Sequence, residues 1–208
     1  IWNGGLVFQG AIPITFAYAY IATRRRGMPF WLVVDCAIPY LALAQALGRM
    51  GCFFNGCCFG KACDLPWAIR FPMGSPPAYA YPGSGGWSEP VHPTQLYSVI
   101  GLVLICLFLL FLRKQWNPFV GFTMPVYLIL YGVMRFTVEM FRGDGNPTGL
   151  GGGYFTDQQL FSVLSVIIGI VIFLFLALHS KHVTSSAQNE QNSEKKTKKK
   201  TKEQKQTQ

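Results

Sequence analysis

The sequence predicts an all-α polytopic membrane protein with about five transmembrane helices, a small irregular outer cap and a disordered basic C-terminal tail. Three observations predict this class. Half of the 208 residues are hydrophobic and only 13% are charged, and the mean hydropathy is +0.28, a composition typical of membrane proteins. Long apolar stretches recur along the chain, and Lys and Arg cluster between them at alternate ends.

Five stretches approach the roughly 20 mostly apolar residues that a helix needs to cross a bilayer. They run over residues 5–23, 30–47, 95–112, 120–141 and 156–179. If the five segments alternate, the basic groups at 24–26, 113–114 and in the tail lie on one side, which the positive-inside rule makes cytoplasmic. Residues 48–92, residues 142–155 and the N-terminus then face outward from a bacterial plasma membrane.

The net charge of +9 is concentrated at the C-terminal end. Residues 181–208 hold eight Lys and three Glu and few apolar residues. We therefore expect a disordered cytoplasmic tail at 181–208, after a membrane domain of residues 1–180. Attraction of the tail to an anionic leaflet is favoured over nucleic-acid binding.

The most unusual stretch is Gly-Arg-Met-Gly-Cys-Phe-Phe-Asn-Gly-Cys-Cys-Phe-Gly at residues 48–60. Arg49 stands where the second apolar run ends, and a cation there is costly unless it faces water, a partner or an anion. Dense glycines predict irregular backbone, which a membrane tolerates only inside protein or beside a polar cavity. We expect a folded-in loop around Arg49 at the outer surface. The alternative is an Arg that reaches the interface beside a flexible loop.

Residues 64–92 are rich in Pro, Gly, Tyr and Trp. Pro and Gly suppress regular helices, and Trp and Tyr favour the headgroup zone of a bilayer. This composition predicts an outer cap. Within it we weigh a short hairpin around Trp67–Phe71 against a plain connecting loop.

The fourth apolar stretch carries four polar residues at helical spacing: Tyr131, Arg135, Glu139 and Arg142. They fall on one face, which we expect to point into the bundle. The structural alternative is an Arg135–Glu139 pair that only holds helices together. Arg49 and Arg135 both fall near the outer ends of their stretches. Because the planar guanidinium binds phosphate oxygens in bidentate fashion, we expect these two to clasp one phosphate.

Two further ionisable residues occur in or beside the predicted spans. His92 precedes the third span on the outer side, and it is either a proton-transfer group or an interfacial histidine bonded to the backbone. Asp35 lies early in the second span, near the inner face. We expect Asp35 to be structural and to pair with an Arg or Lys from the inner loops.

Four of the six cysteines, at positions 52, 57, 58 and 63, cluster in and after the glycine-rich stretch. Their spacing is not the usual C-x2-C of zinc sites, and no histidine is near. Small buried packing cysteines are the favoured interpretation. A disulfide, a metal site and a thiol redox site stay open as alternatives.

The ordered set of motifs resembles the bacterial prolipoprotein diacylglyceryl transferase family, over roughly residues 3–175. The matching stretches are residues 4–8, Gly48-Arg49-Met50-Gly51 with Asn55-Gly56 and Gly60, His92-Pro93-Thr94-Gln95-Leu96-Tyr97, Tyr131-Gly132-Val133-Met134-Arg135 with Glu139 and Arg142, and Thr156 with Gln159. The resemblance implies seven spans with an outside N-terminus. Since this chain starts at Ile1 with five, two N-terminal spans are expected to be missing.

The resemblance implies transfer of the diacylglyceryl group of phosphatidylglycerol to the lipobox cysteine thiol of a preprolipoprotein, with release of glycerol phosphate. The partners would be phosphatidylglycerol, lipobox peptides and the bilayer, with no nucleic acid. By the same match, Arg49 binds the lipid, and Arg135 is a second essential arginine with Tyr131 and Glu139 as companions. The nucleophile belongs to the substrate, so no metal or cofactor is expected; His92 is the predicted base. The other predicted substrate-binding residues are Asn55, Gly56, Gly60, Arg142 and Gln9.

The chain departs from the family pattern at several positions. Gln9 stands where many members have a histidine, so a mechanism that relies on that histidine does not carry over. Cys52 and Cys57 replace Asn and Glu, and Ser98 replaces a Glu. Two other functions stay open: a non-enzymatic membrane protein that binds or moves an anionic lipid, and a thiol oxidoreductase using the cysteines at 52–63.

Overall fold

The computed structural model describes residues 7–116, 119–143 and 156–179, with the side chains of the first helix from residue 14 onward. Every long element in these ranges is a helix, and none is a strand. The helices are α1 (Val7–Arg25), α2 (Phe30–Asn55), α3 (Pro76–Ala80), α4 (Thr94–Gln115), α5 (Thr123–Met140) and a last helix, Asp157–His179. The predicted tail at 181–208 and residues 144–155 of the predicted outer loop lie outside the described residues.

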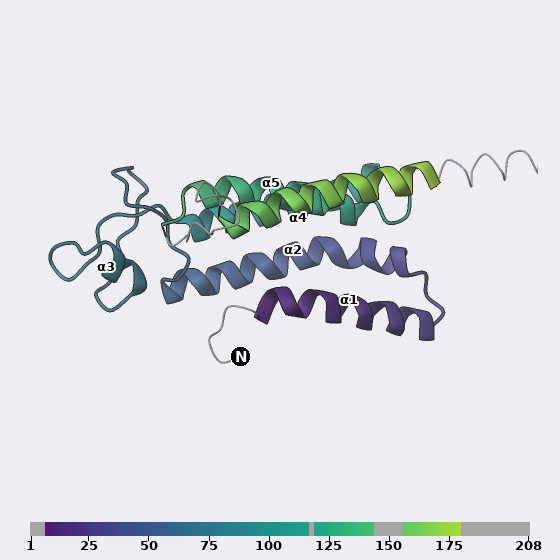
Figure 1. The fold of residues 1–208 in the computed structure, drawn as a ribbon, viewed down its shortest axis with the longest axis horizontal. Helices are drawn as coiled ribbons and strands as arrows, with labels where there is room; N and C mark the ends of the chain where they lie inside the picture. Colours follow the sequence, from purple (N-terminus) through teal and green to yellow (C-terminus); the bar gives the residue numbers. More distant parts are fainter. Residues whose placement is uncertain (1–6, 117–118, 144–155, 180–208) are drawn as a thin grey trace, which may run out of the picture.

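The long helices run side by side along one axis, and the chain between α2 and α4 forms a cap at one end (Figure 1). Three helices are long and apolar enough to cross a membrane: α2, α4 and the last helix. Helix α5 has 18 residues and includes Arg135 and Glu139, and α1 ends in Arg24 and Arg25. These charges make both helices less apolar. The all-helical membrane class is therefore confirmed, whereas the number of five spans is not.

Helix α2 packs against α1, α4 and α5. Its buried Ala42 and Ala46 stand one turn apart and face Leu102 and Leu109 of α4 in the core. Small residues at this spacing let two helix backbones approach closely. Helix α5 and the last helix meet in the same way, because a side chain at Gly132 would lie 2.7 Å from the carbonyl oxygen of Ser162. Most other large apolar side chains stay exposed on the outer faces, as a lipid-facing surface requires.

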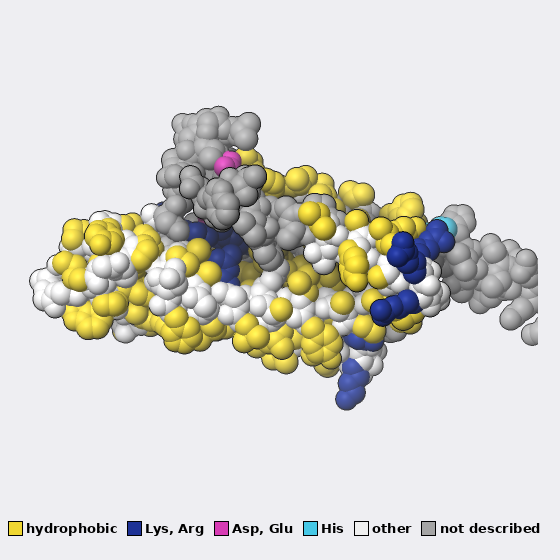
Figure 2. Space-filling view, turned by 90° about the horizontal axis from the view of Figure 1, so that it is seen from below, with side chains coloured by type: hydrophobic (Ala, Val, Ile, Leu, Met, Phe, Trp, Pro, Cys, Tyr) yellow, Lys and Arg dark blue, Asp and Glu magenta, His cyan; other side chains and the backbone are white. Residues whose placement is uncertain are grey.

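The end of the bundle opposite the cap is basic. The C-terminal ends of α1, α4 and the last helix lie there (Figure 1), and residues 24–26 and 113–114 follow or end these helices. Figure 2 shows Lys and Arg side chains at that end and a second group beside the cap, with mostly hydrophobic side chains between them. The basic residues 24–26 and 113–114 of the predicted inner side therefore share one end of the bundle.

Asp35 is buried near this basic end, but the prediction of an Arg or Lys partner is wrong. Its carboxylate accepts hydrogen bonds from the backbone N–H of Gly121 at 2.5 Å and of Thr123 at 3.0 Å, and from the Thr123 hydroxyl at 2.6 Å. The first N–H groups of a helix have no partner within it, and a carboxylate satisfies them well. Asp35 thus fastens the start of α5 to α2.

The prediction of an irregular loop over residues 48–60 is wrong for its first part, because α2 continues to Asn55. A Cβ built on Gly48 or Gly51 would meet nothing within 4 Å, so neither glycine marks a close approach. The helix ends at Gly56, whose φ is +72°. The N–H of Gly56 bonds to the carbonyl of Phe53 at 3.1 Å and that of Cys57 to the carbonyl of Cys52 at 3.1 Å, which together form a Schellman motif.

The cap has its own small hydrophobic cluster, built on Phe59, Phe71 and Val91. Its backbone pairs through isolated bridges, such as Ile69 with Val91. The hairpin considered around Trp67–Phe71 is absent from the described cap, because this segment pairs with distant residues instead of folding back on itself. The cap therefore depends on contacts that local sequence does not predict.

Candidate functional site

Three chain segments meet where the cap joins the bundle. The N–H of Gly60 bonds to the carbonyl of His92 at 3.0 Å, and the N–H of Lys61 to the carbonyl of Phe141 at 2.9 Å. Gly60 also forms an antiparallel bridge with Arg142. A side chain at Gly60 would overlap His92 and the carbonyl of Phe141, so only glycine fits without displacement. This junction draws together predicted site residues from the ends of α2, α4 and α5.

The carboxylate of Glu139 lies at the centre of a polar cluster. The Nη1 of Arg135 is 2.6 Å from Glu139 Oε2, and the Nε of Arg142 is 3.8 Å from the same oxygen. The side chains of Arg135 and Glu139 are 7% and 2% exposed, respectively. The Thr156 hydroxyl donates to Glu139 Oε1 at 3.1 Å. The predicted polar stripe therefore does face the bundle interior, and it holds a buried ion pair.

Thr156 is positioned by a capping box at the start of the last helix. The N–H of Thr156 donates to Gln159 Oε1 at 3.1 Å, and the N–H of Gln159 donates to Thr156 Oγ1 at 3.3 Å. Such reciprocal bonds satisfy two helix-start N–H groups. The last helix thereby presents a hydroxyl to Glu139.

Arg49 approaches the same cluster from α2. Its guanidinium is half-buried and lies close enough to Arg135 to interact with it electrostatically. It interacts in the same way with Cys52, one turn further along α2. Among the described residues, no acidic side chain forms an ion pair with Arg49. Two cations from different helices thus lie within electrostatic range of each other, and Glu139 forms an ion pair with Arg135, an arrangement that favours an anion there.

Tyr131 lies one helical turn before Arg135 and is half-buried. Its ring stacks on that of Tyr127 at 5.6 Å between centroids, and Tyr127 donates a hydrogen bond to Gln45 Oε1 at 2.6 Å. Tyr131 also interacts electrostatically with Arg135. The stack fixes the Tyr131 ring on the side of the cluster nearer the bundle core.

His92 belongs to an aromatic group beside the cluster. Its Nδ1 is 3.2 Å from the Tyr97 hydroxyl, and the Trp67 indole N–H donates to the same hydroxyl at 2.8 Å. The His92 ring also lies 5.2 Å from that of Phe141. Among the described residues, the His92 side chain therefore bonds to a side chain and not to the backbone. Its role as a base stays a prediction. Trp67 and Tyr97 were not predicted as its partners.

The remaining predicted substrate-binding residues are spread around the junction. Asn55 is exposed at the end of α2, and Gly56 is buried in the turn that follows. Gln9 lies in α1, where its side chain is outside the described residues.

Two residues that sequence reasoning passed over hold the chain after α2 in place. The Thr94 hydroxyl donates to the carbonyl of Cys58 at 2.7 Å, and the Gln95 amide donates to the carbonyl of Cys57 at 2.8 Å. Both donors begin α4 and are fully buried. Their place in the His92–Tyr97 motif was the available signal, since polar residues opening an apolar helix need partners.

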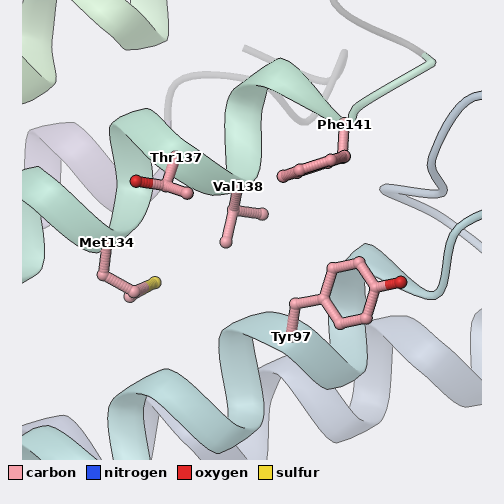
Figure 3. Close-up of a pocket in the computed structure, with 5 residues that line it drawn as sticks. All are labelled: Tyr97, Met134, Thr137, Val138 and Phe141. Carbon is pink, nitrogen blue, oxygen red and sulfur yellow. The ribbon is translucent and has the colours of Figure 1, made fainter.

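An open apolar pocket of about 320 Å³ lies between α4 and α5 (Figure 3). It is lined by Tyr97, Met134, Thr137, Val138 and Phe141. Met134 and Val138 each precede a residue of the polar cluster by one position, so the pocket and the cluster occupy neighbouring faces of α5. An apolar recess beside a cationic cluster matches the two parts of an amphipathic anion.

Fold and site together define a class: a helical membrane protein with a buried arginine–carboxylate cluster at one capped end, next to an apolar recess. Comparison with known proteins agrees. A family model described as prolipoprotein diacylglyceryl transferase matches residues 1–175. The chain therefore belongs to the prolipoprotein diacylglyceryl transferase family.

Curated relatives named phosphatidylglycerol–prolipoprotein diacylglyceryl transferase align with most of the chain. The Synechococcus elongatus protein is 36% identical over 177 residues, covering 82% of this chain and 58% of the relative. The Mannheimia succiniciproducens protein is 33% identical, and the alignment covers 85% of this chain and 62% of that relative. The Clostridium tetani protein is 36% identical, and the alignment covers 82% of this chain and 64% of that relative. The chain thus spans about three fifths of the length of these relatives. Bacterial relatives and apolar helices together support a multi-pass bacterial membrane protein.

Proposed function

We propose that this chain forms the catalytic part of a phosphatidylglycerol–prolipoprotein diacylglyceryl transferase. The reaction moves the diacylglyceryl group of phosphatidylglycerol to the lipobox cysteine thiol of a preprolipoprotein, the first step of lipoprotein maturation. Family membership and the names of the relatives support this reaction. The observation that carries it is the convergence of Arg49 and Arg135 beside the buried carboxylate of Glu139.

The phosphate is the part of the lipid that the two arginines would bind. Glu139 holds one edge of the Arg135 guanidinium, so the remaining N–H donors are kept in a fixed direction. Arg49 supplies a second planar set of donors from α2. Tyr131 is the further residue that we assign to orienting Arg135, and Arg142 stays a predicted substrate-binding residue. The apolar pocket between α4 and α5 would take part of the acyl chains, because it borders the cluster on α5.

In the reaction, the acceptor sulfur forms a bond to the glycerol carbon of the diacylglyceryl group. The bond between that carbon and the phosphate oxygen breaks, and its electron pair stays with the phosphate, which leaves as glycerol phosphate. The thiol proton passes to a base or to solvent; His92 is the candidate base. Negative charge therefore grows on a leaving phosphate oxygen, and fixed arginine donors lower the barrier by stabilising it.

We place the site toward the outer face of the bacterial plasma membrane and the C-terminal tail in the cytoplasm. Support comes from the basic residues 24–26 and 113–114, which lie at the end of the bundle opposite the cap. The exposed Trp67 and Trp87 of the cap suit the headgroup zone.

The test is lipid transfer from labelled phosphatidylglycerol to a lipobox peptide, using the full-length protein in detergent or vesicles. Arg49→Ala and Arg135→Ala should each lower the rate by at least about 100-fold, as expected for loss of one preorganised donor to a developing anion. The control is Arg24→Ala, a change at the exposed opposite end that should leave the rate unaltered. Near-wild-type transfer by Arg49→Ala would refute the proposed site.

The same assay separates the competing functions. A non-enzymatic lipid-binding protein would retain phosphatidylglycerol but form no thioether on the peptide. A thiol oxidoreductase would form no thioether either, and would instead change the number of free thiols in a substrate protein. Product analysis by mass spectrometry distinguishes the three results.

A further inference from the structure

Three cysteine thiols meet at the end of α2. The Sγ atoms of Cys52, Cys57 and Cys58 all lie within 4.8 Å of one another, and all three side chains are half-buried. All six cysteines are free, so these thiols are available as ligands. They are not the buried packing residues that sequence alone favoured.

The Schellman motif explains how a C-x4-C spacing brings two thiols together. Its bond from the Cys57 N–H to the Cys52 carbonyl folds the chain back, so that position 57 lies over position 52. From the sequence, packing cysteines are favoured over a metal site because the usual C-x2-C spacing is missing. The turn at Gly56 achieves the same result as that spacing by a different backbone route.

Cys58 completes the triangle through a strained backbone. Its φ is +60°, the left-handed region, and no other non-glycine residue in the described chain has a positive φ. A non-glycine residue in this conformation persists only where its surroundings hold it. Here Thr94 and Gln95 hold it, through their bonds to the carbonyls of Cys58 and Cys57. The three thiols are therefore fixed from a second helix.

The spacing of the thiols suits a soft divalent cation. Zinc binds thiolate sulfur at about 2.3 Å, which places two sulfurs of a tetrahedral site roughly 3.8 Å apart. Side-chain rotation of less than about 1 Å per sulfur would bring the present triangle to that size. The thiol of Cys57 now makes only a weak 3.7 Å bond to the Cys52 carbonyl, which coordination would replace.

We propose that Cys52, Cys57 and Cys58 form a three-thiolate zinc site whose fourth position binds the acceptor thiol of the lipobox peptide. Three protein ligands with one open position are the pattern of catalytic zinc, whereas structural zinc has four. Arg49 stands one turn from Cys52 and within electrostatic range of Arg135, so the thiols border the proposed phosphate site. The part of the proposal in which zinc binds the acceptor thiol rests on the proposed function.

The chemistry balances without a change in the oxidation state of the metal. A thiol that coordinates zinc loses its proton, here to solvent. The bound sulfur then forms the bond to the glycerol carbon, and the phosphate departs with the electron pair of the broken carbon–oxygen bond. The thioether product is uncharged and binds zinc more weakly than a thiolate, so it dissociates. Zinc would thereby promote release of the acceptor proton to solvent without a protein base.

Metal content tests the site independently of lipid transfer. The full-length protein, purified without a histidine tag, should contain about one zinc per chain by mass spectrometry. After chelation, Co²⁺ should restore one equivalent with a thiolate-to-cobalt charge-transfer band in the absorption spectrum. Less than about 0.1 equivalent of either metal in the wild-type protein, or an intact mass showing a disulfide within the triad, would overturn the site.

Variants then assign the ligands. Cys52→Ser, Cys57→Ser and Cys58→Ser should each weaken metal binding at least tenfold, while the half-buried Cys63→Ser, a matched cap cysteine, should bind as the wild type does. Cys57→His retains a zinc ligand, and it should keep the metal with a shifted cobalt spectrum. Unchanged binding in all three serine variants would overturn the assignment.

The role of the metal is tested on the same preparations. Chelated wild-type protein should lose at least tenfold in transfer rate and recover with Zn²⁺ but not with Mg²⁺. Full activity of the metal-free protein would overturn the acceptor role. Arg49→Ala should abolish transfer and keep its zinc. If no preparation transfers lipid while zinc still binds, the proposed function is wrong and the metal site stands.

Discussion

At the scale of single residues, geometry and not charge alone decides what Arg49 can do. Arg49 is half-buried on α2 and lies within electrostatic range of Arg135 on α5. A lysine there would keep the charge and lose the planar, bidentate set of donors. The distinction matters because two oxygens of one phosphate can accept from two N–H donors of one guanidinium.

We predict that Arg49→Lys lowers the transfer rate about 100-fold, a barrier increase of about 3 kcal/mol. The rate is measured with phosphatidylglycerol and a lipobox peptide under single-turnover conditions. Arg25→Lys, at the exposed end of α1, serves as the control and should stay within about twofold of wild type. A rate for Arg49→Lys equal to wild type would mean that charge suffices.

Glu139 is the residue on which the burial of Arg135 depends. Removing one partner of a buried ion pair costs about 3–5 kcal/mol, because the other charge is left unpaired. We therefore predict that Glu139→Gln lowers the thermal unfolding temperature in detergent. It should also reduce transfer, though less than Arg135→Ala, because Gln keeps an oxygen that can accept from Arg135.

The matched control for that experiment is Glu89→Gln, an exposed carboxylate in the cap. Both variants are followed by intrinsic fluorescence during heating, and transfer is expressed per folded molecule. An unfolding temperature for Glu139→Gln equal to that of Glu89→Gln would contradict a stabilising role for the pair.

At the scale of elements, Asp35 joins α2 to α5 by three hydrogen bonds. We predict that Asp35→Ala destabilises the protein by roughly 1–3 kcal/mol, because buried N–H groups at the start of α5 lose their acceptor. The exposed Asp64→Ala is the control, and hydrogen exchange at residues 121–125 is the local measurement. Wild-type protection in that segment would show that other groups satisfy those donors.

At Gly60 the cap contacts His92, just before α4, and Phe141, just after α5. A methyl group there would lie 2.5 Å from the His92 carbonyl oxygen and 2.8 Å from that of Phe141. We predict that Gly60→Ala destabilises by about 1–3 kcal/mol through overpacking and makes the cap more sensitive to protease.

Gly51→Ala provides the contrast, because no atom lies within 4 Å of its added methyl and the position is helical. That variant should be neutral or more stable by about 0.5–1 kcal/mol. Equal protease sensitivity of the two variants would contradict the prediction that close packing at Gly60 stabilises the cap.

At the scale of the whole molecule, the bundle is polarised, with the cap and the Arg49–Arg135 region at one end and basic residues 24–26 and 113–114 at the other. We predict that Trp87→Cys, in a background without other cysteines, reacts with an impermeant maleimide added to intact cells. Lys114→Cys should react only after permeabilisation. Labelling of Lys114→Cys from outside would reverse the proposed orientation.

The sequence by itself determined the class of the protein and the polar face of α5. Both depend on local properties: apolar length predicts helices that can enter a bilayer, and 3.6-residue periodicity puts Arg135 and Glu139 on one side. The order of the motifs also sufficed to predict the family, which the comparisons confirm. The sequence did not predict the continuation of α2 to Asn55, because dense glycines favour irregular backbone.

Only the tertiary structure decided which distant residues meet. Asp35 accepts from residues more than 80 positions away, and Arg49 faces Arg135 because α2 packs against α5. The thiol triangle needs both a left-handed turn at Gly56 and donors from the start of α4. Such contacts arise from how helices and cap pack together, and neither spacing nor composition of a single segment contains that information.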